Sequence, residues 1–237
     1  MKILFLHGFP DNPEVWRHCV AHFEGRALCR TPELHSLTFE KQIARIHEMT
    51  ADDAEVILVA HDVGGALATE YAARYPAKVA QVVLINSIGL AMFAHRLRML
   101  EQLLRSSYMS VFLNPLVNSL TLRPFARILL KLIYDLGGLP KDDPLRANSP
   151  DVLDGLARFK ELMWQIPKKL FEPGEPLMMP VDVILCDKDP LHMKPSASEL
   201  QRFFRDARLH TLPSGHWPMR TDAQAFNSLL DQVLRLG

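Results

Sequence analysis

Short apolar runs recur along the chain, and each is separated from the next by residues with helical periodicity. Five of these runs have the length and composition of strands, at residues 2–6, 55–60, 80–85, 180–186 and 208–212. An uninterrupted apolar run such as 55–60 is typical of a strand that is buried on both faces. Strands of this kind alternating with helices predict an α/β fold, with a mostly parallel sheet and helices on both faces.

The segments between the runs supply the helices. Helices are predicted at residues 13–23, 38–49, 66–75, 196–204 and 223–236. The Thr38 hydroxyl can cap the second of these helices, and Pro76 ends the third because proline cannot continue a helix. With 237 residues, the chain is long enough for one large domain and short for two.

A long stretch at residues 90–176 interrupts this alternation, because strand signals vanish and only helical patterns remain. Apolar helix faces run along 100–111, 125–133 and 152–166. The stretch lies between two runs that belong to the predicted sheet, so we expect an insertion rather than an independent terminal domain. The predicted organisation is a core domain, residues 1–89 and 177–237, with a helical insertion at 90–176.

The charge balance and the cysteine content indicate which binding partners and which cellular compartment to expect. Lys and Arg together number 27 and so do Asp and Glu, so no overall positive field favours nucleic acid. No apolar stretch approaches the roughly 18 residues that a membrane-spanning helix needs. Three cysteines without a C-x-x-C motif favour a reduced, cytoplasmic protein. We therefore expect a small-molecule substrate, with no nucleic-acid or membrane partner.

Residues 60–65, Ala-His-Asp-Val-Gly-Gly, join a predicted buried strand to a predicted helix. A sharp turn at this junction holds its central side chain out of the sheet, and small neighbours let the helix pack closely. The central side chain here is that of Asp62. The N-terminus of the following helix also brings backbone N–H groups beside this side chain.

Three other loops follow predicted strands and carry polar or backbone groups that suit catalysis. Residues 7–10, His-Gly-Phe-Pro, follow the first strand, and the loop 186–190 contains Asp189 with Asp187 as its neighbouring rival. The loop 213–218 offers His216. Because the carboxyl ends of parallel strands meet at one edge of a sheet, these loops are expected to converge.

These four loops, in this order, resemble the α/β-hydrolase family over essentially the whole chain. The resemblance implies the α/β-hydrolase fold without the first two strands of the family's usual sheet, and a cap formed by the insertion. It implies a catalytic triad in which Asp62 is the nucleophile and His216 is oriented by Asp189. It also implies an oxyanion hole made by the backbone N–H groups of Phe9 and Val63.

An aspartate in the nucleophile position favours one class of substrate. A carboxylate with a reference pKa of about 3.9 is ionised at neutral pH and needs no base to attack. Attack on an acyl carbon would give a high-energy anhydride, whereas attack on saturated carbon gives an ordinary ester of Asp62. The chain accordingly resembles the aspartate-nucleophile branch of the family, the epoxide hydrolases and the dehalogenases.

The electrophile is less constrained, and an epoxide is slightly favoured over a haloalkane or a carboxylic ester. Tyr108 and Tyr134 in the insertion are candidates for the acid that an epoxide hydrolase needs, although aromatic residues at helical spacing usually pack. Haloalkane dehalogenases carry a Trp where Val63 stands, and Trp164 is a possible substitute. Haloacetate dehalogenases carry arginines where Val63 and Ala66 stand, which argues against that class.

A non-catalytic ligand-binding protein on the same fold is the alternative from another class. Retention of both Asp189 and His216 argues against it, since a decayed site has no reason to keep both. A metal site is disfavoured as well. His18 and His22 are four residues apart on a predicted helix, but no H-E-x-x-H glutamate or third ligand accompanies them. We expect no metal and no other cofactor.

Overall fold

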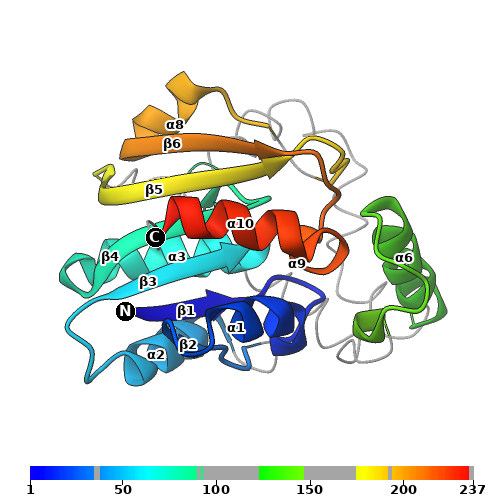
Figure 1. The fold of residues 1–237 in the computed structure, drawn as a ribbon, viewed down its shortest axis with the longest axis horizontal. Helices are drawn as coiled ribbons and strands as arrows, with labels where there is room; N and C mark the ends of the chain where they lie inside the picture. The colour runs from blue at the N-terminus through cyan, green and yellow to red at the C-terminus, as the bar shows by residue number, and fades with distance from the viewer. Residues whose placement is uncertain (35–37, 90–91, 93–122, 147–174, 192–193, 235–237) are drawn as a thin grey trace.

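The computed structural model describes residues 1–34, 38–89, 92, 123–146, 175–191 and 194–234 (Figure 1). Six strands form one sheet in the order β2-β1-β3-β4-β5-β6, and every pairing is parallel. The strands are β1 (Lys2–Leu6), β2 (Leu28–Arg30), β3 (Val56–His61), β4 (Val79–Ile85), β5 (Leu177–Cys186) and β6 (Phe204–Leu212). The predicted α/β fold with a parallel sheet is confirmed.

Helices cover both faces of this sheet, as Figure 1 shows. They are α1 (Arg17–Phe23), α2 (Phe39–Met49), α3 (Val63–Arg74), α6 (Arg123–Leu136), α8 (Ala197–Phe203), α9 (Pro218–Thr221) and α10 (Ala223–Val233), with short 3-10 turns η1 (Pro13–Trp16), η2 (Pro76–Lys78) and η3 (Pro144–Arg146). Helices α2, α3 and α8 share one apolar core with the sheet. Helices α1, α6, α9 and α10 share the core on the other face.

Strand β3 shows why the central strands carry no polar alternation. All six of its residues are buried. Val56, Leu58 and Ala60 belong to the core on one face, whereas Ile57 and Val59 belong to the core on the other. Because successive side chains point to opposite faces, a strand covered on both sides must be apolar throughout.

One strand of the structure was not predicted from the sequence, and one predicted helix begins as a 3-10 turn. Strand β2 is three residues long and pairs only with β1 at the sheet edge. Its side chains are half-buried or exposed, so it carries no apolar run for a pattern to detect. The predicted helix at 13–23 begins as the 3-10 turn η1, whose Asn12 cap accepts a hydrogen bond from the Glu14 N–H.

Helix α6 and the turn after it make up most of the described part of the predicted insertion, to which residues 92 and 175–176 also belong. They lie between β4 and β5 in sequence and beside the end of the sheet that carries α9 (Figure 1). Leu130 and Tyr134 on α6 are buried in the core shared with α9 and α10. The helix faces predicted at 100–111 and 152–166 fall outside the described residues, so the division into core and cap remains a prediction.

No helix in the described part of the chain is both long enough and apolar enough to cross a membrane.

Candidate active site

Asp62 occupies the turn between β3 and α3 with a backbone conformation that is rare for a side-chain-bearing residue. Its φ is 49° and its ψ is −122°, in a region where backbone strain is stored at functional sites. The turn is held by hydrogen bonds from the Asp62 N–H to the Ile85 carbonyl (3.1 Å) and from the Ser87 hydroxyl to the Asp62 carbonyl (2.7 Å). Asp62 therefore lies at the carboxyl end of β3, directly before α3.

Two glycines let the neighbouring backbones approach this turn closely. A Cβ atom on Gly8 would lie 2.7 Å from both Cβ and Oδ2 of Asp62. A Cβ atom on Gly64 would lie 2.5 Å from the Leu6 carbonyl oxygen. Both distances are shorter than real Cβ contacts, so any larger residue would push the loop 7–10 or helix α3 away from the Asp62 side chain.

The Phe9 backbone N–H donates a hydrogen bond to Asp62 Oδ2 at 3.1 Å. Val63 is the first residue of α3, and the first N–H groups of a helix have no partner within it. The structure thus places one predicted oxyanion-hole donor on the Asp62 carboxylate. It places the other at the helix N-terminus, directly after Asp62 in the chain.

His216 and Asp189 form a buried pair beside this turn. His216 Nδ1 lies 2.7 Å from Asp189 Oδ2, and the two side chains are 5% and 0% exposed. Asp189 Oδ1 accepts the Leu191 N–H at 2.8 Å, which fixes the carboxylate plane. Its rival Asp187 is exposed. Because a carboxylate accepts, Nδ1 carries a proton in this arrangement, and Nε2 is left to act as a base.

The pKa of His216 is raised above the ordinary value for histidine. Burial alone would lower this pKa, but the hydrogen bond to Asp189 and the negative charges of Asp62, Asp189 and Asp11 outweigh burial. The charge on Asp62 thus acts directly on the histidine. The nucleophile candidate and the base candidate lie in one electrostatic environment.

The backbone of His216 is held by a buried network that sequence reasoning missed. The His216 carbonyl accepts hydrogen bonds from Asn86 Nδ2 and from His61 Nε2, both at 2.9 Å. His61 Nδ1 lies 3.1 Å from Asp11 Oδ2, and the Trp217 indole N–H donates to Asp11 Oδ1 at 3.0 Å. Asp11 directly follows the predicted loop 7–10 and His61 lies within the motif 60–65, but neither position signals such a role.

Of the three aromatic candidates in the predicted insertion, Tyr134 is the one that lies among the described residues. Tyr134 on α6 is buried, and its ring centroid lies 5.3 Å from that of Trp217. The Arg146 guanidinium lies 5.4 Å from the centroid of the Tyr134 ring. Tyr134 therefore packs on the residue next to His216. Tyr108 and Trp164 lie outside the described residues, so their proposed roles remain predictions.

Metal ligands are not gathered anywhere in the described part of the chain, where no three His, Cys, Asp or Glu side chains could hold an ion. His22, one of the two helical histidines, instead pairs with Asp231 at 2.9 Å.

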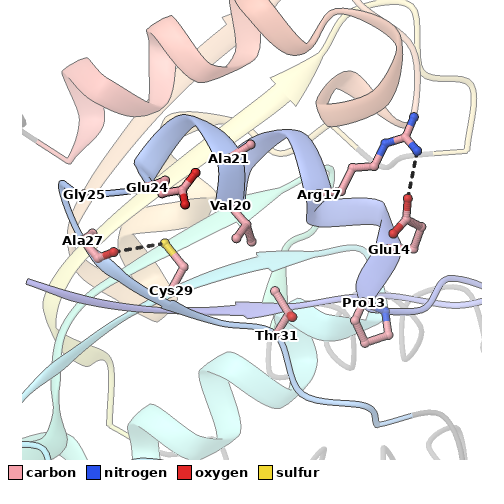
Figure 2. Close-up of a pocket in the computed structure, with 10 residues that line it drawn as sticks. All are labelled: Pro13, Glu14, Arg17, Val20, Ala21, Glu24, Gly25, Ala27, Cys29 and Thr31. Carbon is pink, nitrogen blue, oxygen red and sulfur yellow. Dashed lines mark hydrogen bonds and ion pairs between the residues drawn. The ribbon is translucent and has the colours of Figure 1, made fainter.

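A groove of about 580 Å³ lies between α1 and the edge strand β2. Figure 2 shows its lining residues, Pro13, Glu14, Arg17, Val20, Ala21, Glu24, Gly25, Ala27, Cys29 and Thr31. None of them is a predicted site residue. The groove lies outside the group of residues around Asp62 and His216.

Comparisons with known proteins identify the family and its fold. The sequence model of the alpha/beta hydrolase family matches residues 3–229. Epoxide hydrolase 3 of Mus musculus is 24% identical over 256 residues, which cover 96% of this chain and 69% of the relative.

Two solved structures share the fold over nearly the whole chain. An epoxide hydrolase from Bacillus megaterium in complex with an inhibitor is 22% identical, with a TM-score of 0.69 over 99% of this chain and 93% of that one. A laboratory-evolved variant of potato epoxide hydrolase is 18% identical, with a TM-score of 0.74 over 100% and 92%. At these identities the structural matches establish the fold.

Proposed function

The chain belongs to the alpha/beta hydrolase family of enzymes, and we propose that it hydrolyses an epoxide in two steps, with Asp62 as nucleophile. The observation that carries the proposal is the Asp62 carboxylate at the strand-to-helix turn, with Oδ2 held by the Phe9 N–H. This hydrogen bond engages one oxygen and leaves Oδ1 as the attacking atom. The naming of relatives as epoxide hydrolases supports an epoxide as the substrate.

In the first step, Asp62 Oδ1 attacks a ring carbon of the epoxide. The new bond joins Oδ1 to that carbon, and the ring carbon–oxygen bond breaks with its electron pair passing to oxygen. An acid must protonate the resulting alkoxide, and Tyr134 and Tyr108 are the candidates. The product of this step is an alkyl ester of Asp62 that carries a free hydroxyl group.

In the second step, His216 Nε2 takes a proton from water, and the water oxygen attacks Cγ of the Asp62 ester. Negative charge then develops on Oδ2, the oxygen that the Phe9 N–H already contacts. Collapse of this intermediate breaks the bond between Cγ and Oδ1, and the leaving oxygen takes the proton from His216, so that the diol is released. The new carboxylic acid at Asp62 gives its proton to the deprotonated acid of the first step, which restores both groups. The Phe9 and Val63 N–H groups stabilise the developing charge, and losing one such donor typically costs roughly 100- to 1000-fold in rate.

Two other substrate classes of the family, haloalkanes and carboxylic esters, rank below epoxides. A haloalkane would also be attacked at saturated carbon, but Val63 stands where dehalogenases carry a tryptophan. A carboxylic ester would be attacked at acyl carbon, where a carboxylate nucleophile gives an anhydride. The proposal therefore ranks epoxides first and alkyl halides second.

Isotope labelling tests the covalent intermediate. We expect that turnover of an epoxide in ¹⁸O-water places label in the Asp62 carboxylate, because water attacks Cγ rather than the substrate. A single turnover with enzyme in excess should give unlabelled diol, since its new oxygen comes from Asp62. Mass spectrometry of the peptide that contains Asp62 measures the label, with enzyme kept in ¹⁸O-water without substrate as control. Label in the first-turnover diol and none in Asp62 would refute the ester.

The pH dependence should differ between the free enzyme and the ester intermediate. The pKa of His216 is raised partly by the Asp62 charge, and alkylation removes that charge. We therefore expect the pKa of His216 to be above about 6.5 in the free enzyme and to fall when the ester forms. Ester hydrolysis needs neutral His216, so its rate should rise with pH through this lower value.

Two measurements check this prediction. An NMR titration of His216 gives the pKa in the free enzyme, and single-turnover ester hydrolysis at a series of pH values gives that of the intermediate. Equal pKa values in the two states would show that the Asp62 charge does not act on the base.

A further inference from the structure

The loop that carries His216 rests directly on backbone from the predicted insertion. We define residues 213–217 as the histidine loop and residues 137–146 as the insertion segment. The His216 N–H donates to the Gly137 carbonyl at 2.9 Å. A Cβ atom on Gly137 would lie 2.3 Å from a ring carbon of Trp217, and one on Gly215 would lie 2.6 Å from the Gly137 carbonyl oxygen. The two backbones therefore touch with no room for side chains between them.

A buried ion pair attaches the insertion segment a second time. Arg220 on α9 donates from Nε and Nη2 to the two carboxylate oxygens of Asp143, at 3.1 and 2.8 Å. Its Nη1 donates to the Glu14 carbonyl at 3.2 Å. The Arg220 and Asp143 side chains are 1% and 9% exposed. A two-point arginine–carboxylate contact fixes orientation as well as distance.

Both attachments act on the same short piece of chain. Helix α9 begins at Pro218, directly after the histidine loop, and the Arg220 N–H donates to the Trp217 carbonyl at 2.9 Å. On the other side, Asp143 Oδ1 also accepts the Leu145 N–H at 2.8 Å, which ties the carboxylate to its own turn. If the ion pair were lost, the hydrogen bond from the His216 N–H to the Gly137 carbonyl would still join the histidine loop to the insertion segment. The ion pair would no longer hold the segment beside α9.

We propose that Arg220 and Asp143 are positioning residues for the base His216. They hold the insertion segment against the histidine loop, so that the imidazole keeps the geometry in which Nε2 activates water. This inference rests on the proposed two-step hydrolysis. It predicts a larger effect of the pair on hydrolysis of the ester than on its formation, because only hydrolysis uses His216 as a base.

The test compares Asp143→Asn with a matched control. Asn keeps the shape of the side chain and removes the nearer of the two carboxylate charges that face Arg220; the other is Glu14 Oε1, 3.8 Å from Nη1. The control is Asp53→Asn, since Asp53 is also buried, with a side chain 1% exposed, and pairs with Arg30 and Lys2 before β3, at the opposite end of the strands. Amide hydrogen exchange of the free enzyme, followed by NMR, should show the His216 N–H exchanging roughly tenfold faster or more in Asp143→Asn. The control should leave it unchanged.

Rapid-quench kinetics with an epoxide then separates the two steps. In Asp143→Asn we expect ester formation near the wild-type rate and hydrolysis slower by roughly 10- to 100-fold, because small misplacements of a catalytic group have effects of this size. Arg220→Lys keeps the charge but loses the two-point contact, and it should show a smaller change of the same kind. This second variant also serves if Asp143→Asn does not fold.

Each outcome separates this inference from the proposed function. Unchanged exchange at the His216 N–H, or equal slowing of both steps, would overturn the positioning role. Failure of the wild-type enzyme to form an ester would instead refute the proposed function, and the exchange measurement would still decide whether the ion pair anchors the histidine loop.

Discussion

The Asp62→Asn variant is expected to keep the fold and to lose epoxide turnover by roughly 10⁴- to 10⁶-fold, the range found when a member of a catalytic triad is removed. An amide oxygen has no negative charge with which to attack saturated carbon. The substitution is mild for the structure because Asn has nearly the same shape and volume as the Asp that already occupies this strained turn. Its carbonyl oxygen can also still accept the Phe9 N–H.

The measurement is steady-state turnover of an epoxide panel, with thermal unfolding as a check on folding. Asp187→Asn is the matched control, because Asp187 is an exposed carboxylate two residues from Asp189 and outside the buried pair. Turnover by Asp62→Asn within tenfold of wild type would contradict the nucleophile assignment. If Asp62→Asn still hydrolysed an added carboxylic ester substrate, the site would carry out a different reaction.

The turn around Asp62 could be predicted because its requirements are local. A buried strand, a sharp turn and a closely packed helix need small residues at fixed offsets, and these offsets are visible in the sequence at Ala60 and Gly64. The structure shows the physical reason at Gly64, where a Cβ atom would collide with the Leu6 carbonyl oxygen. The Phe9 N–H contact to Asp62 follows from the same parallel pairing of β1 and β3.

The network behind His216 could not be predicted because it depends on side chains far apart in sequence. Asn86 and His61 lie after and within strands whose apolar patterns say nothing about polar partners. Their hydrogen bonds to the His216 carbonyl exist only because β3, β4 and β6 end near one another. A single sequence carries no signal for such a meeting of three loops.

The insertion shows the same limit on a larger scale. Helical periodicity correctly indicated a helix over 125–133, and α6 includes it. The pattern could not say which element the helix face would meet. In the structure Tyr134 packs on Trp217, and the turn that follows α6 is paired to Arg220. These contacts connect α6 and the turn after it to the loop of His216, which periodicity alone does not indicate.

His216 is the residue whose removal should stop the reaction halfway. In the proposed mechanism the first step uses an ionised carboxylate and requires no base, whereas the second requires Nε2 to take a proton from water. Asp189 holds Nδ1 at 2.7 Å and thereby leaves Nε2 as the basic nitrogen. A glutamine in place of His216 preserves much of the volume and removes the base.

We therefore expect His216→Gln to accumulate the Asp62 ester in a one-to-one ratio with the protein, while overall turnover falls by roughly 10⁴-fold or more. Intact-mass spectrometry after incubation with epoxides should show the mass of the substrate added to the protein, and peptide mapping should locate it at Asp62. The double variant Asp62→Asn with His216→Gln should gain no mass, which excludes alkylation elsewhere. Mass added to this double variant would show that the adduct does not depend on Asp62 and would contradict its assignment as the nucleophile. No adduct on His216→Gln from any epoxide or alkyl halide would contradict the two-step mechanism, because ester formation needs no base and ester hydrolysis does.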